Sequence, residues 1–266
     1  MYGTIHARAD GLTMPDHYFE FRHVSKAFDD HLVLDDVSFT VDPGETCVIL
    51  GRSGVGKSVS LKHILGFLQP DSGEVWVAGE NITGWNEDQL ASIRRRVAMV
   101  FQSGALFDSL TVYENVAFPL EGRGLSEALI DRRVTELLQM LEVAQFAGVL
   151  PADLSTGMKR AVAIARVLAQ EPEAILFDEP TTMVDPIMAG HVGGLIRRLK
   201  ESFHKTSIVV THDTHLARKL ADRVVFLQEG RVAFFGPWAE FESSPQAFLR
   251  NFLLQDALIP ALDQTA

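Results

Sequence analysis

Short apolar runs alternate along the chain with segments in which apolar residues recur every three or four positions. The runs at residues 46–50, 174–177 and 207–210 are uninterrupted, which predicts central strands buried on both faces. Strands that alternate with helices indicate a largely parallel sheet wrapped by helices. We therefore predict an α/β fold, with any ligand at the carboxyl ends of these strands.

A segment of different character lies between the first two strands, and in it helical spacing dominates. Its apolar residues recur at three and four positions, as in Ile130, Val134, Leu137, Leu138 and Leu141, which indicates a helical insert. Another helical pattern, at residues 247–254, follows the pair Gly236-Pro237. The predicted division is an N-terminal tail at 1–17, a core at 18–101 and 161–236, a helical subdomain at 102–160 and a C-terminal extension at 237–266.

Charge and cysteine content narrow the classes of protein that fit this chain. Its 266 residues include 24 lysines and arginines against 35 aspartates and glutamates, and the net charge of −11 argues against nucleic acid as the main partner. The single cysteine, Cys47, falls inside a predicted strand, so we expect a buried apolar side chain and a reducing cytoplasm. Nowhere do about 18 apolar residues run together, so any membrane work is expected to fall to a partner.

The stretch GRSGVGKS follows the first strand and fits the pattern G-x-x-x-x-G-K-S/T in its required place between a strand and a helix. Glycines let backbone N–H groups turn inward around a phosphate, and the helix that starts near Lys57 points its positive dipole end at the same anion. Lys57 is expected to reach the terminal phosphates, and Ser58 to bind Mg²⁺. The predicted ATP-binding residues of this loop are Gly51, Arg52, Ser53, Gly54, Val55, Gly56, Lys57, Ser58 and Val59.

Polar residues also follow the other two strands, as Asp178 and Glu179 after the second and His212 after the third. A further motif, LSTGMKR at residues 154–160, precedes the helical pattern AVAIARVLA. With this motif the chain resembles the ATPase subunits of ABC transporters over nearly its whole length. The motifs that carry the resemblance come in that family's order, namely the phosphate loop at 51–58, Phe101-Gln102, the signature at 154–158, the Walker B strand at 174–179, the D-loop at 182–185 and His212.

The resemblance implies a P-loop NTPase fold of the ABC type, with a mostly parallel core sheet, an antiparallel β portion and a helical subdomain. It also implies catalytic and metal-binding roles. Glu179 would orient and deprotonate the attacking water, and His212 would contact the γ-phosphate. Asp178 and Gln102 would join Ser58 around Mg²⁺, and Lys57 would hold the phosphates.

The same resemblance implies a head-to-tail dimer that encloses two ATP molecules. Ser155 is the expected N-cap of the signature helix, which would aim its dipole at the γ-phosphate held by the opposite subunit, with Gly157 beside it. Asp185 would reach across the dimer. Phe28 occupies the position from which the family stacks an aromatic ring on adenine, and a plain core phenylalanine is the alternative.

The signature departs from the common LSGGQ at Thr156 and Met158. Methionine at this position and the sequence of residues 101–120 resemble the ATPases of MCE-type lipid transport systems such as Mla. We therefore expect an ATPase at the cytoplasmic face of the inner membrane that drives a permease for phospholipids with an MCE protein. The alternatives are an importer ATPase for amino acids or other polar solutes, and a permease-independent ABC ATPase that acts on DNA or ribosomes.

Two apolar groups of residues raise questions of burial. Leu106, Phe107, Val112 and Phe118 either line a groove for a cytoplasmic helix of the permease or pack inside the helical insert. The tail carries more apolar residues than a disordered end would, so it either folds back on its own subunit or reaches the opposite one. These tail residues are Trp238, Phe241, Phe248, Leu249, Phe252, Leu253 and Leu254.

Overall fold

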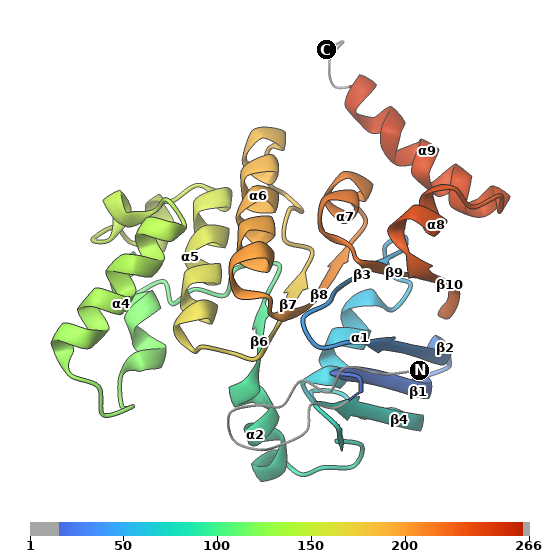
Figure 1. Cartoon of the computed structure of the whole chain (residues 1–266), viewed down its shortest axis with the longest axis horizontal. Helices are drawn as coiled ribbons and strands as arrows, with labels where there is room; N and C mark the ends of the chain where they lie inside the picture. The colour runs from blue at the N-terminus through green and yellow to red at the C-terminus, as the bar shows by residue number, and fades with distance from the viewer. Residues whose placement is uncertain (1–15, 263–266) are drawn as a thin grey trace, which may run out of the picture. The chain divides into compact units, whose positions relative to one another are not determined.

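The computed structural model describes residues 16–262, with side chains through Leu254. The chain divides into two compact units, residues 1–93 with 221–266 and residues 94–220 (Figure 1). All but the last two residues of the predicted N-terminal tail lie outside the described range. The predicted division into core, helical subdomain and extension stays a prediction.

The first unit contains an antiparallel sheet in the strand order β2-β1-β4-β5. Its strands are β1 (Phe19–Phe28), β2 (His31–Val41), β4 (Ser72–Val77) and β5 (Glu80–Asn81). Phe21 and Phe39 point to the buried side of this sheet and stack with ring centroids 4.6 Å apart. The expected antiparallel β portion is confirmed, and helix α2 (Glu87–Arg96) follows it in the chain.

Strand β3 (Thr46–Leu50) of the same unit pairs in parallel with β9 (Arg223–Gln228), and β10 (Arg231–Pro237) adds antiparallel to β9. All five residues of β3 are buried, as its uninterrupted apolar pattern predicts. Cys47 is fully buried, which confirms the expected buried side chain, and burial raises the pKa of its thiol. Six residues separate the end of β3 from the start of helix α1 (Lys57–Ile64).

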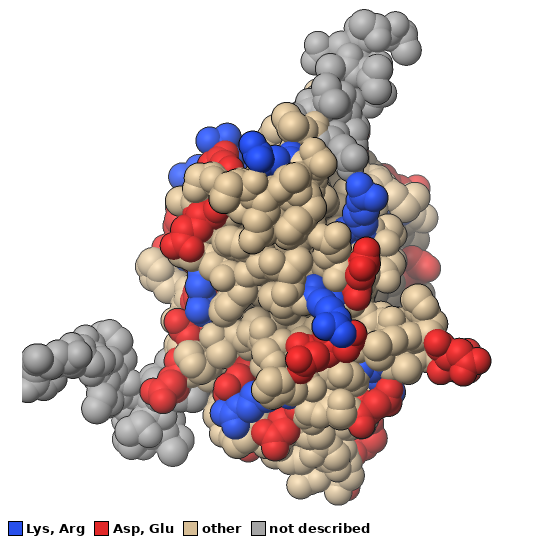
Figure 2. Space-filling model, turned by 90° about the vertical axis from the view of Figure 1, so that its right-hand side faces the viewer, with Lys and Arg blue, Asp and Glu red and all other residues tan. Residues whose placement is uncertain are grey.

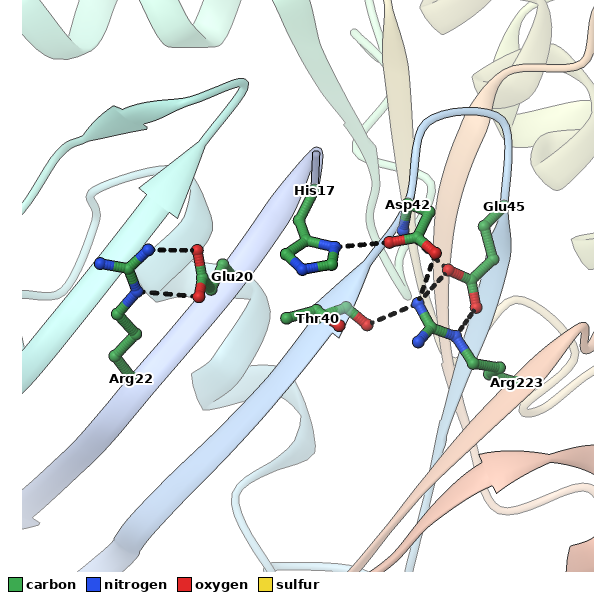
Figure 3. A network of polar contacts seen from close by, with 7 residues as sticks. All are labelled: His17, Glu20, Arg22, Thr40, Asp42, Glu45 and Arg223. Atoms are coloured by element: carbon green, nitrogen blue, oxygen red, sulfur yellow. Dashed lines mark hydrogen bonds and ion pairs between the residues drawn. The ribbon is translucent and has the colours of Figure 1, made fainter. Parts of the chain in front are cut away.

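A polar network ties the turn between β2 and β3 to the start of β9 (Figure 3). The Arg223 guanidinium donates to both carboxylate oxygens of Glu45 and, at 3.1 Å, to the Thr40 carbonyl. Asp42 lies 3.4 Å from Arg223 and 2.6 Å from His17 Nδ1. The hydrogen bonds that Arg223 donates to Glu45 raise the pKa of Arg223. Because Glu45 directly precedes β3, this bridge fastens the start of β3 to the start of β9.

The tail forms α8 (Trp238–Glu242) and α9 (Ala247–Leu262). Phe226 of β9 lies 5.8 Å from Phe241, 6.0 Å from Phe248 and 4.8 Å from Phe252, measured between ring centroids. Leu249 is fully buried, whereas Leu254 is mostly exposed. The first part of the tail therefore folds back on its own subunit, which is the first of the two alternatives.

The second unit contains the parallel strands β6 (Val97–Val100), β7 (Ala174–Asp178) and β8 (Thr206–Thr211), with β7 between the other two. Every residue of the three strands is buried, which confirms the prediction of buried strands at 174–177 and 207–210, now β7 and β8. The helices of this unit include α5 (Thr156–Ala169), α6 (Pro186–Phe203) and α7 (Thr214–Leu220). Helix α5 lies between α4 and α6 (Figure 1).

Helix α4 (Glu127–Met140) carries the predicted three-and-four spacing, and Val134, Leu137 and Leu138 are buried on it. The shorter helix α3 (Val112–Ala117) starts at a capping box, in which the Thr111 side chain accepts from the Glu114 N–H and Glu114 accepts from the Thr111 N–H. Short 3₁₀ turns complete the segment at Phe118–Leu120, Ala144–Phe146 and Pro151–Asp153.

On the face drawn in Figure 2, acidic and basic side chains lie interspersed among uncharged ones. Within the described range, no helix is long and apolar enough to cross a membrane.

Candidate nucleotide-binding site

The phosphate loop between β3 and α1 is shaped by close backbone approaches at two glycines. A Cβ at Gly51 would lie 2.6 Å from the Leu227 carbonyl oxygen, and one at Gly56 would lie 2.9 Å from the Val33 carbonyl oxygen. Gly56 also has φ 101°, a conformation that favours glycine. These glycines are required by geometry, as the sequence pattern predicts.

Lys57 folds over its own loop. Its ammonium group donates to the carbonyl oxygens of Gly51 at 2.8 Å and Arg52 at 3.0 Å. The N-cap of α1 is Gly56, which brings no side chain to the first amides of the helix. Helix amides and a lysine at one loop form an arrangement that suits an anionic phosphate.

Phe28 ends β1 in the same unit and is 40 % exposed, so it is not a core residue. The Lys26 ammonium lies 5.7 Å from the centroid of its ring. An exposed aromatic face beside a cation offers a surface for a planar base, and the stacking role stays a prediction.

In the second unit, Glu179 and His212 meet at the ends of the paired strands β7 and β8. His212 Nδ1 lies 2.9 Å from Glu179 Oε2, and the Thr182 hydroxyl donates to the same oxygen at 3.0 Å. The Glu179 backbone has φ 46°, and its N–H donates to the Val210 carbonyl at 2.9 Å. The Glu179 side chain is only 12 % exposed, so a strained backbone holds a shielded carboxylate beside the imidazole.

Asp178 is the last residue of β7 and is nearly buried. Arg160 of α5 lies close enough that the Asp178 charge counteracts the lowering of the Arg160 pKa by burial. Arg160 was not among the predicted site residues. The available signal was a charged residue beside the apolar positions of a helix, and such a residue is more often solvated.

Ser155 caps α5 as predicted, because its hydroxyl accepts from the Met158 N–H at 3.3 Å. A Cβ at Gly157 would lie 2.6 Å from Met188 Cε, so a glycine allows α5 and α6 to pack closely at their N-termini. Asp185 caps α6 by accepting from the Met188 N–H at 3.0 Å. Thr156 is exposed beside these caps.

Gln102 lies exposed in the turn after β6, two residues beyond the strand. Ser58, Gln102 and Asp178 offer a hydroxyl, an amide and a carboxylate oxygen, which are the ligands that Mg²⁺ prefers. The donor chemistry therefore fits a magnesium ion. The predicted residues fall in both units, with Phe28 and the phosphate loop in the first and the others in the second.

A sequence model of the family described as ABC transporter matches residues 34–182, which is more than half of the chain. The chain belongs to the ABC transporter family. It is 40 % identical over 217 residues to the methionine import ATP-binding protein MetN of Francisella tularensis subsp. holarctica (strain OSU18), and this covers 82 % of the chain and 62 % of that protein. This ABC transporter chain therefore spans less than two thirds of the length of that relative.

A second relative is the sulfate/thiosulfate import ATP-binding protein CysA of Gloeobacter violaceus, which is 39 % identical over 239 residues, covering 90 % of the chain and 68 % of that protein. Among solved structures, the chain is similar to the dimeric ATP-binding cassette MJ0796 bound to ADP and Pi, with TM-score 0.75 and 34 % identity over 82 % of the chain and 98 % of that structure. These comparisons confirm the ABC-type fold. They do not support the expected phospholipid cargo or MCE partner, because the named relatives import methionine and sulfate or thiosulfate.

Proposed function

We propose that this chain binds ATP with Mg²⁺, hydrolyses it and powers a separate membrane permease. The observation that carries the proposal is the contact of Glu179 with His212 at the ends of two adjacent buried strands. A shielded carboxylate beside an imidazole suits a general base that takes a proton from water. The phosphate loop, with its required glycines and Lys57, supports the binding half of the proposal.

The chain's own residues divide this work. Lys57 and the loop amides bind phosphate oxygens, and Ser58, Gln102 and Asp178 would hold Mg²⁺. When bound, Mg²⁺ supplies positive charge that offsets the negative charge of the phosphates. Glu179 accepts the proton of the attacking water while Thr182 and His212 fix the position of its carboxylate.

A second copy of this chain and a permease are the proposed protein partners. The capped N-terminus of α5, with Ser155 and Gly157, supports a surface that meets the ATP of another copy, since helix N-termini attract anions. Asp185 caps the neighbouring helix and belongs to the same proposed interface. A solved relative with the same fold is described as dimeric, which supports this assembly.

The permease is proposed to bind at the aromatic pair Phe107 and Phe118. Their ring centroids lie 4.8 Å apart, and they are 43 % and 48 % exposed. Val112 is fully buried and Leu106 is half-buried, so two of the four residues considered for a groove are available to a partner as exposed side chains. Exposed paired aromatics favour protein contact, and this surface would face the cytoplasmic side of the membrane.

For the cargo we favour an importer of amino acids or other small polar solutes, because both named relatives are importers of that kind. Phospholipid transport with an MCE protein is a second candidate, and Met158 together with residues 101–120 supports it. Purification of the complex from native membranes distinguishes the two. A periplasmic solute-binding protein in the complex supports the importer, and an MCE protein supports the lipid system.

Nucleotide binding by the purified chain tests the first step of the proposal. Lys57→Ala should weaken ATP binding in an equilibrium titration, because it removes a positive charge from the phosphates. Lys62→Ala, on the same helix but outside the loop, is the matched control and should bind ATP as the natural chain does. Equal affinity in the natural chain and Lys57→Ala would contradict the assignment of the loop.

A further inference from the structure

A single helix contacts the loop at residues 101–107 at its beginning, middle and end. Arg160 of α5 donates through Nη1 to the Phe101 carbonyl at 2.7 Å. Arg166 of the same helix donates through Nη2 to the Gly104 carbonyl at 3.4 Å, and its guanidinium carbon lies 5.5 Å from the centroid of the Phe107 ring. Six residues of helix rise about 9 Å, so the two arginines reach separate points along the loop.

Moving a charged guanidinium out of water costs free energy unless the group is paired or hydrogen-bonded. Arg160 is 3 % exposed, and within the described residues its Nε has no hydrogen-bond partner. Burial lowers the pKa of both Arg160 and Arg166. A buried charged group is often no more stabilising than an apolar residue of the same size, so general stability does not explain the buried Arg160 beside the half-buried Arg166.

The far end of the loop is also held by a side chain. Asn115 of α3 is fully buried, donates to the carbonyls of Phe107 and Leu110 at 3.1 and 2.9 Å, and accepts from the Phe107 N–H at 2.8 Å. Within the loop, the Gly104 N–H donates to the Phe101 carbonyl, the same oxygen that Arg160 contacts. The loop therefore has defined anchors at both ends, and those at Phe101 and Gly104 come from α5.

We propose that Arg160 and Arg166 are positioning residues that fasten the loop of Gln102 to α5, the helix that begins at the Ser155 cap. Gln102 follows Phe101 directly, so a shift of α5 is transmitted to the Gln102 side chain through Arg160. Arg166 extends the same connection to Phe107, at the surface proposed for the permease. This inference rests on the proposed function for the role of Gln102, and on geometry alone for the fastening.

Hydrogen–deuterium exchange of the full chain tests the fastening without any activity. In Arg160→Met and Arg166→Met, amide exchange in residues 101–107 should accelerate about tenfold or more, because a hydrogen bond from a charged donor is lost. Exchange in α5 should stay unchanged. Unchanged exchange in the loop of both variants would overturn the proposal.

Arg133→Met is the matched control. Arg133 of α4 pairs with Glu171 at 2.9 Å, and within the described residues its Nε likewise has no hydrogen-bond partner. Within the described residues, no hydrogen bond or ion pair joins Arg133 to the loop, so Arg133→Met should leave the exchange of residues 101–107 as it is in the natural chain. Accelerated loop exchange in this control would show a general loosening and would also overturn the proposal.

The magnesium dependence of ATP hydrolysis tests the connection to Gln102. In Arg160→Met the Mg²⁺ concentration for half-maximal hydrolysis should rise about tenfold, as when an outer partner of a metal ligand is removed. Affinity for ATP without Mg²⁺ should not change. Gln102→Ala should raise the Mg²⁺ requirement similarly, and Arg160→Met combined with Gln102→Ala should add nothing further.

Additive effects in the double variant would show that Arg160 acts independently of Gln102, which overturns the connection. Arg160→Lys keeps a donor and a charge, so its Mg²⁺ concentration for half-maximal hydrolysis should lie between those of the natural chain and Arg160→Met. If Arg160→Met does not fold, Arg160→Lys and Arg166→Met carry the test. A natural chain that hydrolyses no ATP would refute the proposed function, while the exchange experiment would still decide the fastening.

Discussion

The phosphate loop of the first unit and the Gln102 loop of the second each follow a short buried strand, yet they are held in opposite ways. At Gly51 and Gly56 the phosphate loop depends on the absence of side chains, because a Cβ there would approach neighbouring atoms too closely. The Gln102 loop depends on polar side chains of neighbouring helices that donate to its backbone, namely Arg160, Arg166 and Asn115. A loop whose amides bind a ligand needs glycines, so that no side chain covers the backbone. A loop that is to move together with a helix needs side-chain hydrogen bonds to that helix.

The phosphate loop of the first unit is proposed to bind ATP, and residues of the second unit to hydrolyse it. A substitution in the second unit should therefore change the rate of hydrolysis without changing ATP affinity, and the largest effect is expected from Glu179→Gln. The substitution removes the general base, so hydrolysis should fall by about 10²–10⁴-fold. ATP affinity should persist, because the phosphate loop is unchanged. Phosphate release and an equilibrium ATP titration on the same preparation measure the two quantities.

The matched control for this prediction is Glu201→Gln, an exposed glutamate of α6 that pairs with Arg197. Its hydrolysis rate should equal that of the natural chain. Turnover in Glu179→Gln at the natural rate would remove Glu179 from the catalytic role and would leave the contact with His212 as a structural one.

Asn115→Ala should have the next largest effect, on stability and not on binding. It removes the side-chain hydrogen bonds to the Phe107 N–H and the Leu110 carbonyl, and the free energy of unfolding should fall by about 2–4 kcal/mol. Chemical denaturation measures this loss. Asn251→Ala, at an exposed position of α9, is the control and should change stability by less than about 0.5 kcal/mol. Equal stabilities would mean that the loop is held by other groups.

Gly56→Ala tests the glycine side of the comparison. Its Cβ would lie 2.5 Å from Leu34 Cδ2 and 2.9 Å from the Val33 carbonyl oxygen, at φ 101°. Overpacking of this kind costs about 1–3 kcal/mol, so ATP affinity should fall about tenfold. Gly54→Ala is the control, because at φ 83° it meets backbone strain without a neighbouring atom of the described chain within 4 Å. A smaller loss at Gly56 than at Gly54 would contradict the role of close approach.

Local sequence patterns predicted the features that depend on local structure. The apolar runs predicted β3, β7 and β8, and the Ser155 cap followed from its place before a helical pattern. The phosphate loop was recognised because its glycines and lysine stand close together in the chain. In each case the physical constraint acts between near neighbours in sequence.

The contacts that hold the Gln102 loop join residues far apart in the chain, and these were not predicted. Arg160 meets Phe101 across 59 residues and Arg166 meets Gly104 across 62, so no spacing rule connects them. The burial of Val112 follows from the phase of α3 after its Thr111 cap, and this separates it from exposed Phe107. The cargo was inferred from Met158 and neighbouring residues of the proposed ATPase. An ATPase subunit that drives a separate permease need not touch the cargo, so its sequence constrains the cargo only weakly.

The smallest effect is expected from His63, which lies on α1 behind the phosphate loop. His63 is fully buried, and its Nδ1 lies 2.8 Å from the Val59 carbonyl oxygen. Burial lowers its pKa, and the nearby Lys26 lowers it further, whereas the Val59 carbonyl and Asp71 act in the opposite direction. The unfolded chain therefore binds a proton near pH 6.5 that the folded chain takes up only at lower pH. Stability from the neutral imidazole is present above about pH 6.5 and is lost as the pH falls through the folded pKa.

Thermal melting between about pH 7.5 and 5.5 should thus show a steeper fall of the melting temperature in the natural chain than in His63→Leu, which has no imidazole to protonate. Equal slopes in the natural chain and His63→Leu would show that protonation of His63 does not oppose folding.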